Sequence, residues 1–271
     1  MRFRSREACA FAILIFFLIL APIYAQQFVS SPVAVDPQAL AVLKQAAAAL
    51  QGATAVTDVT LSGSAHRIAG SDDELGTIVL KALGTGASRM DLNLPSGQLS
   101  EVRNVTGAIP SGTWTGPDGT IHPILFHNLR TEPSWFFPSF GVGRTLSTSL
   151  FSLAYVGLEN RLGHSVHHVS ITQSATSLSM TSVLNTHLSE TDYYFDEKTL
   201  LPVALTYNTH PDDNAAVDVP VEIQFSDYRP VGTSQVPFRV QYFLNNVLFL
   251  DLQVQTVSFN TGLTATAFAV N

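Results

Sequence analysis

The last third of the chain alternates apolar with mainly polar residues over several long runs. Apolar residues take every second position at 201–207, 219–225, 236–242 and 248–254. Because successive side chains of a strand point to opposite faces of a sheet, a period of two predicts strands with one face in the core. Asn245 and Asn246, between the last two runs, tolerate the positive φ of a tight hairpin turn and predict antiparallel neighbours.

The same period occurs earlier, at 59–66, 78–82 and 89–94, with turn-forming segments at 95–97 and 116–119. These runs predict about ten strands. Strand patterns do not alternate with helix patterns, so the sequence does not indicate parallel strands. Wide twisted sheets do not stay flat. The predicted fold class is therefore mainly β (α+β): a large curled antiparallel sheet, or half-barrel, with an N-terminal helix and short helices or loops closing the concave face.

A short helical pattern is formed by Met180, Val183, Leu184 and Leu188, and a longer helix is predicted at 38–51. Asp36 is a suitable N-cap, Pro37 fits the first helical position, and Gly52 follows the alanine-rich run as a terminator. Its apolar positions recur at intervals of three and four, so one face should pack on the sheet. These positions are Leu40, Leu43, Ala47 and Leu50.

The N-terminus has the pattern of a secretory signal peptide. Basic residues precede an apolar stretch that ends in small residues, which predicts cleavage near Ala25 and places the protein in the periplasm or outside the cell. We expect a signal peptide at 1–25, a linker at 26–35 and a single β-rich domain at 36–271, with no transmembrane segment after cleavage. Since Cys9 is the only cysteine, the mature chain has no disulfides and depends on its core.

The charge balance excludes two classes of partner. The chain carries a formal net charge of −7, and cleavage of the signal would remove three arginines and one glutamate. An acidic protein is unsuited to nucleic acids or anionic lipid surfaces.

The densest histidine cluster in the sequence, and so the first candidate for metal binding or catalysis, is His164, His167 and His168. In a strand at 165–173, alternation directs His167 and His168 to opposite faces, so they do not converge on one ion. The loop beginning at His210 is interpreted as a polar turn, and its acidic residues lack a calcium-loop spacing. No Gly-x-Ser-x-Gly pentapeptide or phosphate loop is present. We predict no metal, no cofactor and no enzymatic activity.

The segment at 125–153 is too aromatic for a solvated loop, so it should complete the core or enclose an apolar ligand. The candidate ligand-binding residues are Trp135, Phe136, Phe137 and Phe140 from this segment, with Met90, Leu92, Val240 and Tyr242 from the sheet.

Several features together resemble the LolA/LppX-like exported lipoprotein and lipid carriers. They are the signal peptide, the capped helix, the curled antiparallel sheet, and the late run 194–202 (YFDEKTLLP) with the ending 254–260 followed by Phe268. The likeness covers chiefly residues 36–52 and 190–270, and no residue of the family's transfer machinery can be assigned to a position here. It implies a half-barrel whose concave apolar face, closed by helices or loops, shelters acyl chains.

These features favour an exported carrier or sensor for a lipid, a lipoprotein acyl chain or another apolar ligand. One alternative is a module with a filled core that binds another envelope protein through an edge or outer face. A hydrolase built around His164, His167 and His168 is a third. An internal cavity favours the first hypothesis, and a filled core favours the second.

Overall fold

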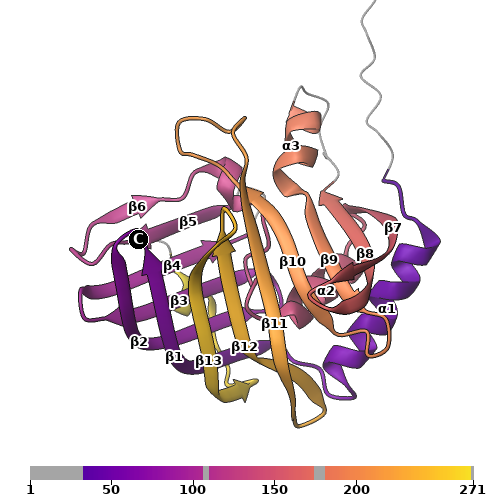
Figure 1. Cartoon of the computed structure of the whole chain (residues 1–271), viewed down its shortest axis with the longest axis horizontal. Coiled ribbons are helices and arrows are strands. Elements are labelled where there is room, and N and C mark those ends of the chain that lie inside the picture. Colours follow the sequence, from indigo (N-terminus) through magenta and orange to yellow (C-terminus); the bar gives the residue numbers. More distant parts are fainter. Residues whose placement is uncertain (1–32, 106–109, 174–180, 270–271) are drawn as a thin grey trace, which may run out of the picture.

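The computed structural model describes residues 33–105, 110–173 and 181–269, so the predicted signal peptide lies outside the described residues. The described strands form one antiparallel sheet in the order β6-β5-β4-β3-β2-β1-β13-β12-β11-β10-β9-β8-β7. The sheet is strongly curled and is not closed into a barrel (Figure 1). The predicted fold class is confirmed, with 13 strands where about ten were expected from the periodicity.

The first strands are β1 (Asp58–Ala69), β2 (Asp72–Leu83), β3 (Ala87–Leu94), β4 (Gly97–Asn104), β5 (Ser111–Thr115) and β6 (Ile121–Pro123). The later strands are β7 (Phe151–Arg161), β8 (His164–Gln173), β9 (Thr191–Asp196), β10 (Pro202–Thr209), β11 (Val219–Val231), β12 (Ser234–Leu244) and β13 (Val247–Phe259). The helices are α1 (Pro37–Gln51), α2 (Pro138–Ser147) and α3 (Thr181–Ser189), with 3-10 turns η1 (Phe126–Leu129) and η2 (Ala265–Phe268).

Glycines and bulges permit the strong curl. The register between β1 and β13 shifts at Gly63, where an added Cβ would overlap the carbonyl group of Gln253. A Cβ at Gly76 of β2 would likewise overlap the Asn93 carbonyl of β3. Bulges increase the local twist of a strand, and glycine allows backbones to approach closely. The sheet therefore bends most readily where these small residues lie.

Helix α1 begins as predicted. Asp36 Oδ1 accepts hydrogen bonds from the backbone N–H groups of Gln38 (2.7 Å) and Ala39 (3.1 Å), and Gly52 ends the helix with a φ of 59°. The buried stripe is displaced from the predicted one: Leu40 and Ala47 are only partly buried. The fully buried positions are Ala39, Val42, Leu43, Ala46 and Leu50. Alanines lie in the stripe because α1 packs closely against α2 as well as against the sheet.

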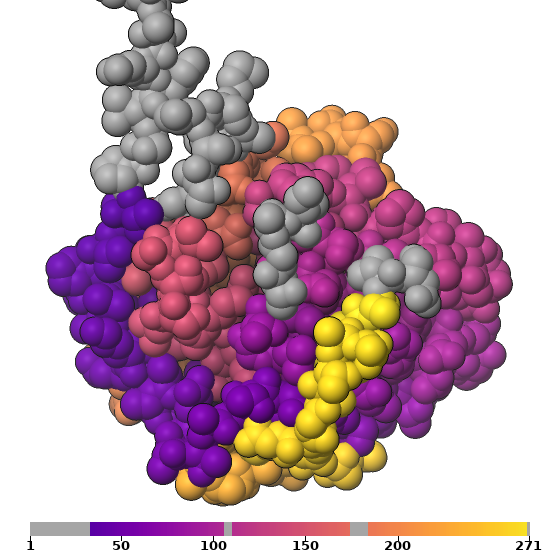
Figure 2. Space-filling model, turned by 180° about the vertical axis from the view of Figure 1, so that it is seen from behind, coloured from indigo at the N-terminus to yellow at the C-terminus, as the bar shows by residue number. Residues whose placement is uncertain are grey.

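The sheet has an inner face, which carries the main hydrophobic core, and an outer face. The C-terminal segment packs on the outer face, where Phe268 of η2 is fully buried beside Ala87 and Val102 of β3 and β4. Figure 2 shows this segment in yellow, running over the strands of the N-terminal half. Asp58 holds its start, accepting hydrogen bonds from the N–H groups of Thr261 (2.8 Å) and Gly262 (3.1 Å). Among the described residues, no helix is long and apolar enough to cross a membrane.

Candidate functional site: the inner face and the segment that closes it

Residues 124–147, called here the closing segment, lie across the inner face. The segment contains η1 and α2, and its side chains Trp135, Phe136, Phe137 and Phe140 are all at most 6 % exposed. The aromatic middle predicted to bury itself therefore does so. Its aromatic side chains pack against the strands of the inner face in one hydrophobic cluster.

The predicted ligand-binding residues lie in one hydrophobic cluster. Leu92 of β3 and Val240 of β12 are buried in it, and Met90 and Tyr242 are partly buried against it. The ring of Trp135 lies edge-on to that of Tyr242, with centroids 5.4 Å apart. Within the closing segment, Phe137 lies edge-on to Phe140 at 4.8 Å. The sheet residues and the aromatic residues thus share the inner face, and the aromatic rings occupy the space beside the strands.

Polar groups join the closing segment to β4. Arg103 projects from the inner face of β4 and donates to Glu101 Oε1 at 2.6 Å. Its Nη1 also donates to the carbonyl oxygen of Asn128 (2.9 Å) and to Thr131 Oγ1 (3.0 Å). Burial lowers the pKa of Arg103, but the neighbouring Glu101 carboxylate outweighs this and leaves it raised. Arg103 therefore stays charged and fixes η1 to the sheet.

Asn128 also reaches the opposite side of the sheet. Its Oδ1 accepts from the His210 N–H (2.9 Å) and from Thr209 Oγ1 (2.9 Å), and its Nδ2 donates to the His210 carbonyl oxygen (2.8 Å). Six strands separate β4 from β10 in the sheet, so a flat sheet would hold them roughly 33 Å apart. A single buried asparagine bridges both because the sheet curls almost onto itself. We call the Arg103–Asn128–His210 connection the latch.

A second buried polar group organises the closing segment itself. Arg144 of α2 donates to Glu132 Oε2 at 2.6 Å, and the Ser134 N–H and hydroxyl donate to Glu132 Oε1 at 3.0 and 2.7 Å. Burial raises the pKa of Glu132, but Arg144 and these hydrogen bonds lower it further, so that it remains ionised. Gly141 lies against the Tyr193 hydroxyl, where a Cβ would overlap that oxygen. The closing segment is thus a preformed unit.

Two tyrosines add polar atoms to the inner face. Tyr207 of β10 and Tyr242 of β12 are hydrogen-bonded to each other. Burial raises the pKa of Tyr242 to about 12 and raises that of Tyr207 well above its usual value. Both hydroxyls therefore remain protonated. The inner surface combines apolar rings with a few polar groups near the latch.

A pocket of about 330 Å³ lies beside β9, β10 and β11, and its lining includes Arg161 at the tip of the β7–β8 hairpin. Arg161 from this tip donates to Glu222 at 2.7 Å and lies 3.9 Å over the ring of Tyr194. The lining residues are Arg161, Glu190, Asp192, Thr206, Tyr207, Asn208, Pro220, Val221, Glu222 and Asn246. Its charged lining is unsuited to an acyl chain.

The predicted histidine run does not converge. His167 is hydrogen-bonded to the Tyr155 hydroxyl (2.9 Å), whereas His168 lies on the other face against the ring of Tyr194 (4.5 Å). His164 pairs with Asp196 at 2.9 Å. The opposite directions of His167 and His168 are as predicted from strand alternation.

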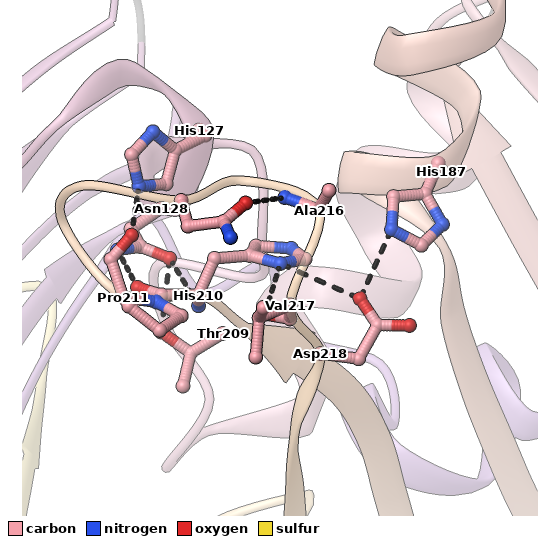
Figure 3. A network of polar contacts seen from close by, with 10 residues as sticks. His127, Asn128, His187, Thr209, His210, Pro211, Ala216, Val217 and Asp218 are labelled. Atoms are coloured by element: carbon pink, nitrogen blue, oxygen red, sulfur yellow. Dashed lines mark hydrogen bonds and ion pairs between the residues drawn. The ribbon is translucent and has the colours of Figure 1, made fainter.

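A different histidine cluster was missed. His187 of α3, His210 after β10 and Asp218 before β11 gather at one end of the sheet, with His127 of η1 nearby (Figure 3). These residues come from separate elements, so no spacing between them in the sequence indicates the cluster. The loop at His210 was recognised only as a turn.

Comparison by sequence finds nothing: no protein-family model and no curated protein matches the chain. Solved structures do match. A domain from Vibrio parahaemolyticus described as an outer membrane lipoprotein-sorting protein domain superposes with a TM-score of 0.54 at 11 % identity, covering 85 % of this chain and 96 % of that one. A LolA superfamily protein from Nitrosomonas europaea gives 0.54 at 11 %, covering 86 % and 97 %. A DUF1329 family protein from Desulfovibrio piger gives 0.53 at 13 %, covering 85 % and 97 %.

The chain therefore has the LolA-like fold, and the predicted resemblance is confirmed at the level of fold. At these identities the likeness concerns architecture and carries no assignment of site residues.

Proposed function

We propose that the protein is an exported carrier or sensor that binds a long acyl chain, or a similar apolar ligand, between the inner face of its sheet and the closing segment. The candidate contacts are Trp135, Phe136, Phe137, Phe140, Met90, Leu92, Val240 and Tyr242. Export rests on the sequence pattern that predicts cleavage near Ala25.

The latch is the observation that carries this proposal. The closing segment rests on the inner face through apolar rings, but it is joined to the two sides of the sheet through the polar contacts of Asn128. Hydrogen bonds between neutral groups contribute only about 0.5–1.5 kcal/mol net, and those to a charged group such as Arg103 about 1.5–3 kcal/mol, because water replaces the lost partner when a group is exposed. The hydrogen bonds of the latch can therefore open at modest cost in free energy. An apolar ligand can then replace the contacts that the aromatic rings make with the inner face.

The energetics set a minimum ligand length. Four aromatic side chains leaving the inner face would each lose about 1.5–3 kcal/mol of burial, or roughly 6–12 kcal/mol together. An acyl chain regains about 0.8 kcal/mol per buried methylene. About a dozen methylenes are needed to offset the rings, so short chains should bind poorly.

The test uses tag-free protein without residues 1–25. We expect co-purified lipid in native mass spectra, uptake of a fluorescent fatty acid, and displacement of this probe by a sixteen-carbon acid but not by an eight-carbon acid. Absence of bound lipid together with absence of uptake would refute the proposal.

A matched pair of variants tests the latch. Arg103→Gln removes the charged link between β4 and η1 and should speed uptake of the fluorescent probe several-fold. Arg89→Gln is the control, since Arg89 on the outer face of β3 makes a similar pair with Asp91, at 2.7 Å, two residues along its strand. Equal uptake rates in the two variants would show that the latch does not limit ligand entry.

A second candidate is a protein-binding module with a filled core. The near-complete burial of the four aromatic rings is consistent with it. β7 lies at the end of the sheet and exposes Val156, Leu158 and Leu162, the last in the turn that follows it. Such an edge can accept an extended segment of another protein. This candidate predicts no lipid uptake, and loss of a partner's binding when Val156 and Leu158 are replaced by lysine.

A further inference from the structure

The cluster of His187, His210 and Asp218 brings three potential metal ligands together. His187 Nε2 lies 3.0 Å from Asp218 Oδ1, and His210 Nδ1 lies 3.4 Å from the same oxygen. One ligand atom from each residue lies within 4.8 Å of the other two. Atoms bound about 2.1 Å from a tetrahedral Zn²⁺ are roughly 3.4 Å apart. The cluster is therefore close to the size that such an ion requires.

The burial of the three residues suits a site with one open position. The His210 side chain is fully buried, whereas those of His187 and Asp218 are 39 % and 43 % exposed. An ion can reach the cluster from solvent on the side of α3 and keep a water molecule as its fourth ligand. Sites with three protein ligands and a water are typical of accessible zinc.

His210 is held in place by its surroundings. Its backbone N–H and carbonyl group are both bonded to the Asn128 side chain, and its Nδ1 lies 3.1 Å from the Val217 carbonyl oxygen (Figure 3). A ligand whose backbone and ring are both fixed loses little freedom when it binds an ion. Within the described residues, His210 Nε2 is buried without a hydrogen-bond partner. The contact of Nδ1 with the Val217 carbonyl oxygen thus leaves this ring incompletely satisfied.

The donor set selects the class of ion. Two imidazoles and one carboxylate suit Zn²⁺ and similar transition metals, whereas Ca²⁺ and Mg²⁺ prefer oxygen ligands alone. His127 is the nearest further imidazole, but its ring centroid lies 6.0 Å from that of His210 and its Nε2 faces the Pro211 carbonyl oxygen at 3.2 Å. His127 is therefore a neighbour of the site and not one of its ligands.

We propose that His187, His210 and Asp218 form a site for Zn²⁺ or a similar divalent transition metal. The ion would join α3 to the loop between β10 and β11, next to the latch residue Asn128. Bound metal would hold His210, and with it the latch, in the closed position. The metal site does not depend on the proposed function, because it requires only these side chains.

The experiment is titration of tag-free, chelator-treated protein with ZnCl2 by calorimetry, with Co²⁺ absorption as a report on coordination. We expect one ion per chain and the visible bands of tetrahedral Co²⁺. His187→Ala and Asp218→Asn should each weaken binding at least about tenfold. Both residues are partly exposed, so these variants should fold, and circular dichroism checks this.

The control is His164→Ala. His164 forms a similar exposed pair with Asp196, at 2.9 Å, and its loss should leave zinc binding unchanged. The proposal is overturned if the wild-type protein binds no zinc, or if His187→Ala and Asp218→Asn bind zinc as tightly as His164→Ala does.

Discussion

Replacing Phe137 by alanine tests whether the closing segment is packed on the sheet as a core. The Phe137 side chain is 1 % exposed. Its ring lies edge-on to Phe140, with centroids 4.8 Å apart, and tilted against Phe259 of β13 at 5.9 Å. Deleting a fully buried ring removes its burial energy and leaves a cavity, which costs about 3–5 kcal/mol, with about 0.5–1.5 kcal/mol of this from each aromatic pair.

Phe126 of the same segment provides the matched control. Its side chain is 46 % exposed and lies under the guanidinium group of Arg130, 4.4 Å from the ring centroid. An exposed cation–π contact contributes about 0.5–1 kcal/mol. Phe126→Ala should therefore lower the free energy of unfolding by at most about 1.5 kcal/mol, which is no more than half the loss expected for Phe137→Ala.

Urea denaturation followed by tryptophan fluorescence measures both variants, with circular dichroism as a second probe. Coincident transitions and an unchanged m-value would show that the difference arises in the folded state. A loss below about 1 kcal/mol for Phe137→Ala, or equal losses in both variants, would refute the packing of the closing segment against β13 described above.

Three further predictions concern stability. Asp36→Ala removes the oxygen that caps α1 and should cost about 1 kcal/mol in urea denaturation, so an unchanged midpoint would contradict the capping role. Leu162→Asn should stabilise the protein by about 1 kcal/mol, because Leu162 is 48 % exposed and has a φ of 52°, which asparagine tolerates better; a lower melting temperature would oppose this. Burial raises the pKa of Asp58, but hydrogen bonds from Thr261 and Gly262 lower it below its ordinary value of 3.8. The contribution of ionised Asp58 to the free energy of unfolding is therefore complete above pH 3.8 and is lost as the pH falls through the folded pKa. The difference in free energy of unfolding between the wild type and Asp58→Asn should shrink from about pH 6 to pH 3. A constant difference would count against these contacts.

Local patterns predicted the secondary structure well. The alternation at 219–225 and 236–242 corresponds to β11 and β12, and Asn245 and Asn246 take the positive φ values of 50° and 62° expected of their turn. The capping of α1 by Asp36 was also predicted correctly. Such features depend on residues a few positions apart, whose steric and hydrogen-bonding preferences act before any tertiary contact forms.

Prediction from the sequence was less accurate for features that depend on tertiary packing. The buried stripe of α1 includes Ala39 and Ala46 instead of Leu40 and Ala47, because contact with α2 rotates the buried face of the helix. The short strands β5 and β6 carry too few residues for a period to be recognised. The burial of the aromatic segment was predicted, but its attachment to both sides of the sheet was not.

The sequence by itself determined most of the longer strands, their antiparallel neighbours, the capped helix and the need to bury the aromatic residues near Trp135. Only the tertiary structure decided that Asn128 meets both Arg103 and His210, and that His187 and Asp218 lie beside His210. Periodicity assigns each side chain to a face of its own strand, whereas these meetings depend on how far the whole sheet curls. That curl results from bulges, glycines and packing summed over many strands, so contacts between residues distant in the chain follow from the complete fold.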